Sequence, residues 1–168
     1  TLYRATFEGP APDVKVKDGV VTIRYQKRLW GLAGLEGLAD VTLNAAIPWH
    51  IAIQGGGSAI TAQLAGLNLA GLEVKGGGSM IRLELPVPSG EVPIQISGGG
   101  SGITVLRPAG VAACVHLKGW GSAFTFDNQT LSNLGSDVRL QSAGYEATDH
   151  RYDIEVSSSG SMVTISSS

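Results

Sequence analysis

The chain has 168 residues, of which 43% are hydrophobic and 15% charged, so it is neither a disordered segment nor too short for one ordinary domain. A formal net charge of −2 argues against a nucleic-acid partner, because such partners require a basic surplus or a basic face. Glycine is abundant at 24 residues but lacks the three-residue period of collagen.

The first segment, residues 1–40, is predicted to form an N-terminal cap and a first, degenerate repeat. Apolar and polar residues alternate from Val14 to Lys17, Asp18-Gly19 is a turn signal, and the alternation resumes with Val21 and Ile23. Strict alternation of this kind indicates strands with one buried face.

Residues 41–126 repeat a glycine corner at steps of 21, 22 and 21 residues. An engineered flexible linker would have a similar composition, but linkers do not recur at a fixed period between alternating strands. We therefore predict turns, in which glycine permits positive φ and a close approach of neighbouring backbones. The corners are Gly55-Gly56-Gly57-Ser58, Gly76-Gly77-Gly78-Ser79, Gly98-Gly99-Gly100-Ser101, the variant Gly119-Trp120-Gly121-Ser122 and the further copy Ser158-Ser159-Gly160-Ser161.

Each corner lies between two alternating stretches. The stretches before it read apolar, any, apolar, polar, as in Ile51–Gln54, Leu72–Lys75, Ile94–Ser97, Val115–Lys118 and Ile154–Ser157. The apolar positions after it are Ile60 and Ala62, Ile81 and Leu83, Ile103 and Val105, Phe124 and Phe126, and Val163 and Ile165. The residues between these pairs are predicted to face outward: Thr61, Arg82, Thr104, Thr125 and Thr164.

A unit of 20–22 residues with short strands and no helical period predicts an all-β fold. We expect a single-stranded, right-handed, parallel β-helix-like solenoid of about seven coils, in which strands of successive units pair side by side. The expected organisation is one domain over residues 1–168. Its regular coils occupy 41–126, irregular loops occupy 127–153, and a final coil occupies 154–168.

Several segments resemble a bacterial group of domains. The marks are Leu67–Val74 before a glycine turn, Leu85-Pro86, Ile96–Ser101, Arg107–Ala112 and the ending Gly144–Val156. On these marks the chain, from Trp30 to Ile165, resembles the LiaF-like cell-envelope stress domains and the related "toast-rack" and "putative adhesin" β-solenoid domains. The resemblance implies a location at the bacterial cell envelope and supplies no catalytic motif.

The residue types that carry chemistry give little sign of a reaction centre. His50, His116 and His150 are widely separated and lack metal-ligand spacing, so no metal site is predicted. Cys114 has no partner for an internal disulfide and is expected to be a buried small hydrophobe. Phosphate-binding and nucleophile motifs are missing as well, and we therefore expect neither a cofactor nor enzymatic activity.

Two places are candidates for binding. Trp120 lies at a corner where the sister repeats have glycine, close to Lys118, and tryptophan is favoured at interfaces. The second place is the irregular segment, where loops carry function if any part does. Its candidate residues are Glu146, Asp149, His150 and Asp153.

The predicted function is a non-catalytic scaffold or binding domain, an adhesin or envelope-stress accessory domain, of a bacterial envelope-associated protein. The alternative is a carbohydrate-binding or carbohydrate-active β-helix that uses the 127–153 loops. The expected partners are another protein or a second copy, through the solenoid ends or the sheet faces, because unpaired strand edges are capped or used. No run of 18 apolar residues is present for membrane insertion, although the start at Thr1 is compatible with a longer, membrane-anchored parent.

Overall fold

The computed structural model describes residues 1–9, 11–25, 38–118, 123–132 and 137–168. Its internal contacts divide the chain into two compact units, Thr1–Asn44 and Ala45–Ser168, which are called unit 1 and unit 2 below. Each unit is described by itself.

Unit 1 is built from antiparallel strand pairs. β1 (Tyr3–Glu8) pairs with β4 (Leu38–Leu43), and β2 (Asp13–Lys17) pairs with β3 (Val20–Arg24). Asp18 and Gly19 connect β2 to β3, and both have positive φ, 51° and 78°. A two-residue turn with this geometry matches the twist of a hairpin. The segment predicted as a cap and first coil thus pairs its own strands in antiparallel fashion.

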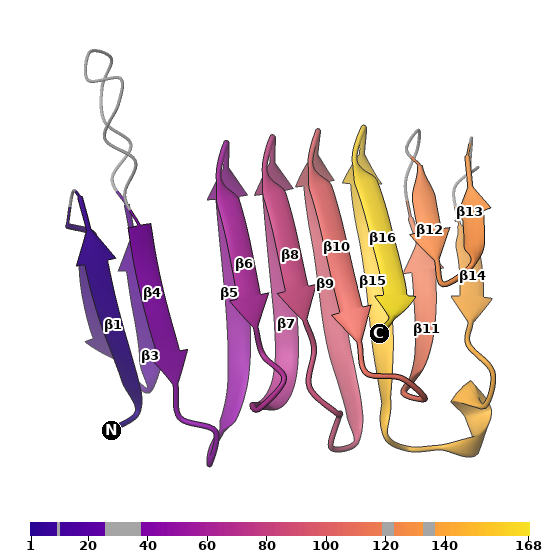
Figure 1. Ribbon diagram of the computed structural model, residues 1–168, viewed down its shortest axis with the longest axis horizontal. Helices are drawn as coiled ribbons and strands as arrows, with labels where there is room; N and C mark the ends of the chain where they lie inside the picture. Colours follow the sequence, from indigo (N-terminus) through magenta and orange to yellow (C-terminus); the bar gives the residue numbers. More distant parts are fainter. Residues whose placement is uncertain (10, 26–37, 119–122, 133–136) are drawn as a thin grey trace. The chain divides into compact units, whose positions relative to one another are not determined.

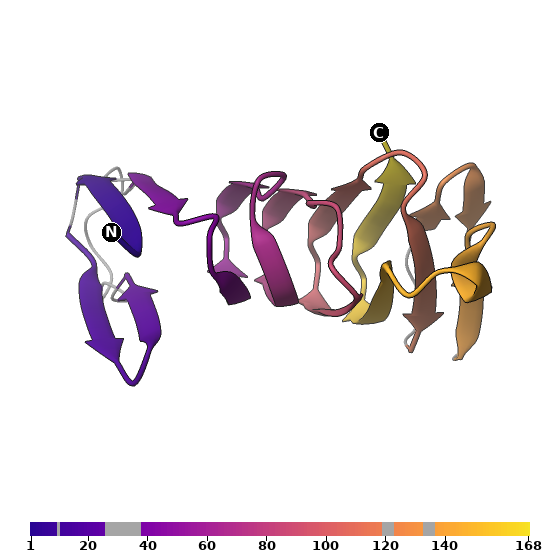
Figure 2. The same ribbon diagram turned by 90° about the horizontal axis from the view of Figure 1, so that it is seen from below.

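Unit 2 contains two six-stranded sheets (Figures 1 and 2). Sheet I has the spatial order β14 (Val138–Gln141), β11 (Ala112–Leu117), β15 (Arg151–Ser159), β9 (Glu91–Gly99), β7 (Asn68–Gly77) and β5 (Pro48–Gly56). Sheet II has the order β13 (Gln129–Leu131), β12 (Phe124–Phe126), β16 (Met162–Ser167), β10 (Gly102–Arg107), β8 (Met80–Glu84) and β6 (Ala59–Gln63). We use the word layer for one strand of sheet I together with the strand of sheet II that follows it in the chain. For example, β7 and β8 form a layer.

This arrangement contradicts the predicted single-stranded parallel solenoid of about seven coils. Both sheets are mixed, because β14 runs antiparallel to β11 and β13 runs antiparallel to β12. The order of the layers in space also differs from their order in the chain. β15 and β16 come last in the chain, yet they lie between β9 and β11 and between β10 and β12, as the yellow β16 in Figure 1 shows.

The structure of residues 127–153, predicted as loops, and of residues 154–168, predicted as a final coil, also differs from the prediction. Residues 127–153 contain β13, β14 and the 3₁₀ helix η1 (Tyr145–Ala147), so they are only partly irregular. Residues 154–168 do not close one end of the fold. They belong to the layer in its interior, which is paired on both sides.

The predicted inward-facing residues of unit 2 do form its core. Parallel registers stack them across the layers, as Ile94 on Ile154 and Ile154 on Val115 in sheet I. A fully buried side chain of this size contributes about 1.5–3 kcal/mol to folding. The largest fully buried side chains are Tyr152, Leu83, Ile94, Ile96, Ile103, Ile154, Ile165, Val74, Val92, Val105, Val115 and Val163.

Within the described residues, the glycine corners at 55–58, 76–79, 98–101 and 158–161 are structured turns between the two sheets, so they are not flexible linkers. The corner at 119–122 lies outside the described residues. At three corners the amide of one serine donates to the hydroxyl of the serine in the next layer: Ser58 N to Ser79 Oγ, Ser79 N to Ser101 Oγ and Ser101 N to Ser161 Oγ, each at 3.2 Å. The corner glycine leaves room for that hydroxyl, because a Cβ on Gly76 would lie 2.7 Å from Ser101 Oγ. Glycine is thus required by the stacking of layers.

Candidate binding surface

The two outer faces of unit 2 differ in chemistry. On sheet I the outward positions form rows across the strands, and the row through the middle of the sheet includes three charged residues. In spatial order that row reads Ala52, Glu73, Gln95, Glu155, His116 and Arg139. Charged side chains on such a face stay solvated and are depleted from the cores of protein interfaces.

The charges of sheet I are arranged in neighbouring pairs. Lys75 Nζ lies 2.7 Å from Glu73 Oε1, and Lys118 Nζ lies 2.6 Å from Glu155 Oε2. The hydrogen bond with Glu155 raises the pKa of the Lys118 amine, which therefore stays charged at neutral pH. Because all four side chains are well exposed, these pairs contribute little to stability and act mainly to balance the charge of the face.

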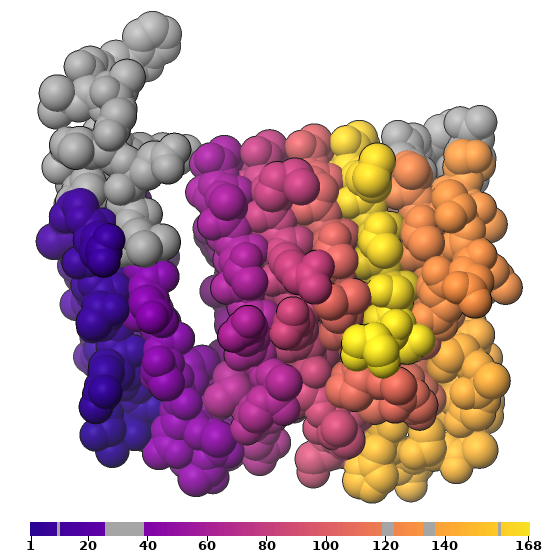
Figure 3. Space-filling model, viewed as in Figure 1, coloured from indigo at the N-terminus to yellow at the C-terminus, as the bar shows by residue number. Residues whose placement is uncertain are grey.

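The outer face of sheet II, which faces the viewer in Figure 3, carries mostly threonine, serine and methionine side chains in its outward positions. Its charged outward pair within the described strands is Arg82 with Glu84, 3.5 Å apart. The predicted outward row is confirmed by the register, but its spatial order places Thr164 between Thr104 and Thr125. Thr130 of β13 extends the row, with its Oγ1 3.2 Å from that of Thr125.

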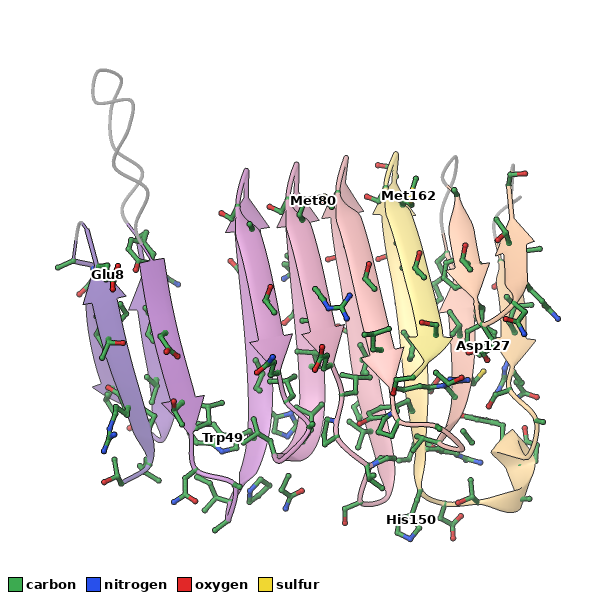
Figure 4. The ribbon with its side chains drawn as sticks, viewed as in Figure 1. Glu8, Trp49, Met80, Asp127, His150 and Met162 are labelled. Atoms are coloured by element: carbon green, nitrogen blue, oxygen red, sulfur yellow. The ribbon has the colours of Figure 1, made fainter. Side chains whose placement is uncertain are left out.

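Two exposed methionines stand beside this row, close to the corners. Met80 is 68% exposed and Met162 is 63% exposed. Both are register partners of Gly102, which lies between them in sheet II. A Cβ on Gly102 would lie 2.8 Å from Met80 Sδ, so the missing side chain lets Met80 lie across the strand toward Met162 (Figure 4). The three residues form a low, weakly polar patch that we call the methionine patch.

The methionine patch was not predicted, although the sequence carries a signal for it. Both methionines follow the serine of a glycine corner directly, and this position repeats in every layer. Because the following apolar residue faces inward, period-two alternation places the methionines outside. An apolar residue at a repeated outward position is the signal that identifies them.

The end of the strands away from the corners carries a second polar group. Arg151 lies 2.7 Å from Glu91 Oε2 through Nη2, stacks 4.4 Å from the Tyr145 ring centroid, and donates from Nη1 to Tyr145 O. The hydrogen bond with Glu91 raises the pKa of the Arg151 guanidinium, and burial raises the pKa of the Tyr145 phenol. These contacts attach η1 to the start of β15.

The sequence-predicted binding residues occupy different parts of unit 2. Glu146 accepts from Gln141 Nε2 at 3.0 Å, and His150 Nδ1 accepts from Gly90 N at 2.9 Å, both near the start of β15. Figure 4 shows His150 at the end of the strands opposite Met80 and Met162, and the adjacent Asp149 is exposed.

The remaining predicted residues do not join that group. Asp153 faces outward on β15, beside Cys114 and Pro93 in register. Lys118 lies at the corner end of β11, where its amide donates to Val156 O, so the length of the sheet separates it from η1. Trp120 lies outside the described residues. The structure therefore brings Glu146 and His150 to one end of the sheet and leaves Lys118 at the other.

Cys114 is buried as predicted, but it lies on the outer side of sheet I instead of in the main core. It packs there with Ala112 and Tyr145 of η1, and Arg139 Nε approaches its sulfur at 3.1 Å. Its burial therefore comes from η1 covering the sheet. His116 Nε2 lies 2.6 Å from Asp137 Oδ1, and no group of three metal-ligating side chains exists among the described residues.

An open depression of about 240 Å³ lies on the outer face of sheet I over β5, β7 and β9. His50, Gly71, Pro93 and Gln95 line part of it. It lies where the register between β5 and β7 shifts, between Trp49 and His50. The His50 ring occupies the space above Gly71, where a Cβ would lie 2.7 Å from Nδ1.

Comparison with known proteins extends the description of the fold. No family model matches the sequence, and no curated protein matches it. Among solved structures, a "putative cell adhesion protein" from Clostridium sporogenes ATCC 15579 is similar, with a TM-score of 0.80 and 18% sequence identity. The alignment covers 99% of this chain and 83% of that one, and at this identity it establishes a shared fold alone. This neighbour is consistent with the adhesin part of the resemblance, whereas the LiaF-like part stays a prediction.

Among the described residues, no helix has the length and apolar character needed to cross a membrane.

Proposed function

We propose that this chain is a non-catalytic binding module of the adhesion type, and that the outer face of sheet II contacts a protein partner. The observation that carries the proposal is the contrast between the two outer faces. Sheet I displays the charged pairs of Lys75 with Glu73 and of Lys118 with Glu155, whereas sheet II displays the threonine row and the methionine patch beside the single described pair of Arg82 with Glu84.

The composition of the sheet II face suits protein recognition. Methionine is enriched at interface cores, and its flexible thioether adapts to varied surfaces. Threonine is stiff at χ1, so a row of threonines loses little side-chain entropy when it is covered. The expected partner therefore presents a flat, weakly charged surface. The similar structure from Clostridium sporogenes is a "putative cell adhesion protein", and the resemblance implies an envelope location; both support the same proposal.

The proposal is tested by binding of the purified protein to intact cells of the organism that encodes it. We compare the wild type with the double variant Met80→Glu/Met162→Glu, which adds two charges to the methionine patch. The control is Gln54→Glu/Gln95→Glu, which adds two charges to exposed positions of sheet I. The expected result is an affinity lowered at least about tenfold, equal to 1.4 kcal/mol, for the methionine variant only.

Two results would contradict the proposal. The first is an equal loss for both double variants, which would indicate a general effect of charge. The second is an absence of cell binding by the wild type.

The carbohydrate-active alternative is addressed separately, by hydrolysis assays on a polysaccharide panel with Glu146→Ala, Asp149→Ala and Asp153→Ala. Activity lost in these variants would favour that alternative over a non-catalytic module.

A further inference from the structure

The last layer, β15 and β16, occupies a slot between two layers that precede it in the chain. β9 and β11 flank β15 in sheet I, and β10 and β12 flank β16 in sheet II. The flanking layers are joined directly to each other by the short connection 108–111. Without β15 and β16, this segment would leave four strand edges unpaired and the core open in its middle.

The slot is complementary to this segment along its full length. β15 pairs with β9 through nine register positions, from Arg151 opposite Glu91 to Ser159 opposite Gly99. Buried Tyr152 donates its hydroxyl hydrogen to Pro86 O at 2.6 Å. The side chains that fill the slot are almost completely buried: Tyr152, Ile154, Val156, Val163 and Ile165.

These contacts all join residues 151–168 to residues 45–141. Residues 151–168 of a second copy can therefore make the same contacts with residues 45–141 of the first. In the described structure a single connection, residues 142–150, leads from β14 to β15. Its first part stays with β11, because Tyr145 packs on Ala112 and Cys114. Residues 148–150 after η1 contain the exposed Asp149 and His150 and have no regular secondary structure.

We infer that two copies of this chain exchange their last layers, so that β15 and β16 of one copy fill the slot of the other. The exchanged dimer keeps the contacts that residues 151–168 make in the slot. It changes the course of residues 148–150, whose bond to β9 is the exposed one between His150 Nδ1 and Gly90 N. A small change of this kind is the condition under which strand exchange has a low energetic cost. The order of synthesis favours it. Residues 45–141 emerge first and present an open slot with unpaired edges before their own last layer is available.

The geometry limits how the two copies are arranged. Ala147 and Arg151 are four residues apart in the chain, so the connection between them spans at most roughly 14 Å. The two copies of η1 must therefore lie close to each other, near the ends of the strands away from the corners.

The methionine patch is complete in the monomer and in the exchanged dimer, with Met162 supplied by the second copy in the dimer. The inference therefore stands or falls independently of the proposed function.

The test uses cysteine variants in a Cys114→Ala background. Ser97 and Ser157 are register partners on the outer side of β9 and β15. Single variants Ser97→Cys and Ser157→Cys are mixed, unfolded, refolded together and oxidised. A disulfide-linked heterodimer between the two forms only where β15 of one copy pairs with β9 of the other. The control mixes Ser97→Cys with Lys75→Cys, since Lys75 and Ser97 are also register partners but both remain in their own chain after exchange.

The expected result is a covalent heterodimer for the Ser97 and Ser157 pair and only background for the control pair. While dimers are a minority, their share rises about tenfold when the refolding concentration is raised tenfold. A Gly-Ser insertion after Ala147 lowers that share, because the longer connection makes closure within one chain easier.

A disulfide yield equal to the control at every concentration would overturn the inference, provided that the double variant Ser97→Cys/Ser157→Cys closes its disulfide within one chain. If it does not close there, the outward pair Thr104→Cys and Thr164→Cys on β10 and β16 replaces it under the same criterion. Dimers seen by light scattering without the covalent heterodimer would indicate association through other surfaces and would likewise overturn it.

Discussion

Arg107 at the end of β10 and Asp127 just after β12 form a bidentate ion pair beside β16. Arg107 Nη1 donates to Asp127 Oδ1 at 3.1 Å, and Nη2 donates to Oδ2 at 2.6 Å. Asp127 Oδ1 also accepts from Ser167 N, and Arg107 O accepts from Ser168 N. The pair therefore joins the two neighbours of β16 and binds the backbone after its last core residue.

Replacing Asp127 with asparagine is expected to destabilise unit 2 by about 2–4 kcal/mol, because Arg107 is only 3% exposed and would lose its counter-charge. Asparagine tolerates the positive φ of 51° at this position, so the backbone is not the cause. Asp137→Asn is the matched control. Asp137 also has positive φ and also pairs with a basic side chain, but it is 75% exposed, so a change within about 0.5 kcal/mol is expected. Urea unfolding measures both, and equal losses would contradict the role given to the buried pair.

Gly98→Ala is expected to lower the free energy of unfolding by at least about 3 kcal/mol or to prevent folding. A Cβ at this position would lie 1.7 Å from Gly76 O, and φ is 116°, a conformation that alanine rarely adopts. Gly56→Ala serves as the control, since no atom lies within 4 Å of its Cβ position. Its stability should be unchanged or raised by up to about 1 kcal/mol. Thermal unfolding followed by circular dichroism separates the two outcomes, and a tolerated alanine at Gly98 would disprove the close stacking of corners.

Ser101→Ala is expected to cost about 1–3 kcal/mol, because it leaves the buried amide of Ser79 without an acceptor. Ser58→Ala, in the first layer of unit 2, is the comparison. Its hydroxyl is exposed and lies 3.5 Å from Gly56 O, so a change within about 0.5 kcal/mol is expected. Hydrogen exchange at the Ser79 amide, faster in Ser101→Ala than in Ser58→Ala, would locate the effect. Equal exchange rates would show that the serine ladder does not protect the corners.

Alkaline pH is expected to destabilise unit 2 through Tyr152. Burial raises the pKa of its phenol well above the ordinary value of about 10. The folded state therefore holds the proton more tightly than the unfolded state. The stability that this proton supplies is complete below pH 10 and is lost as the pH rises above it. Tyr152→Phe should be less stable at pH 8 by about 1–3 kcal/mol, through loss of the bond to Pro86 O, but should lose less stability than the wild type between pH 9 and 11. Urea titrations at each pH test this, and parallel pH profiles would contradict it.

The strands and corners of unit 2 were predictable because their determinants are local. Alternation in Ile94–Ser97 and in Ile103 to Val105 places apolar side chains on one face whatever the neighbouring strand is, and a recurring Gly-Gly-Gly-Ser marks a turn at each return. The same alternation explains why Thr104 and Thr164 were correctly expected to face outward.

The order of the layers was not predictable from the repeats, because every layer presents nearly the same edge. Ile154 and Val115 would fit equally well beside Ile94. The period of the repeats alone therefore favours stacking of the layers in chain order. Contacts between residues far apart in the chain decide otherwise: the bond from Tyr152 to Pro86, and the ion pair from Arg107 to Asp127. Local alternation therefore dictated which side of each strand is buried. Which strands became neighbours depended on side chains that meet only when the whole core is closed.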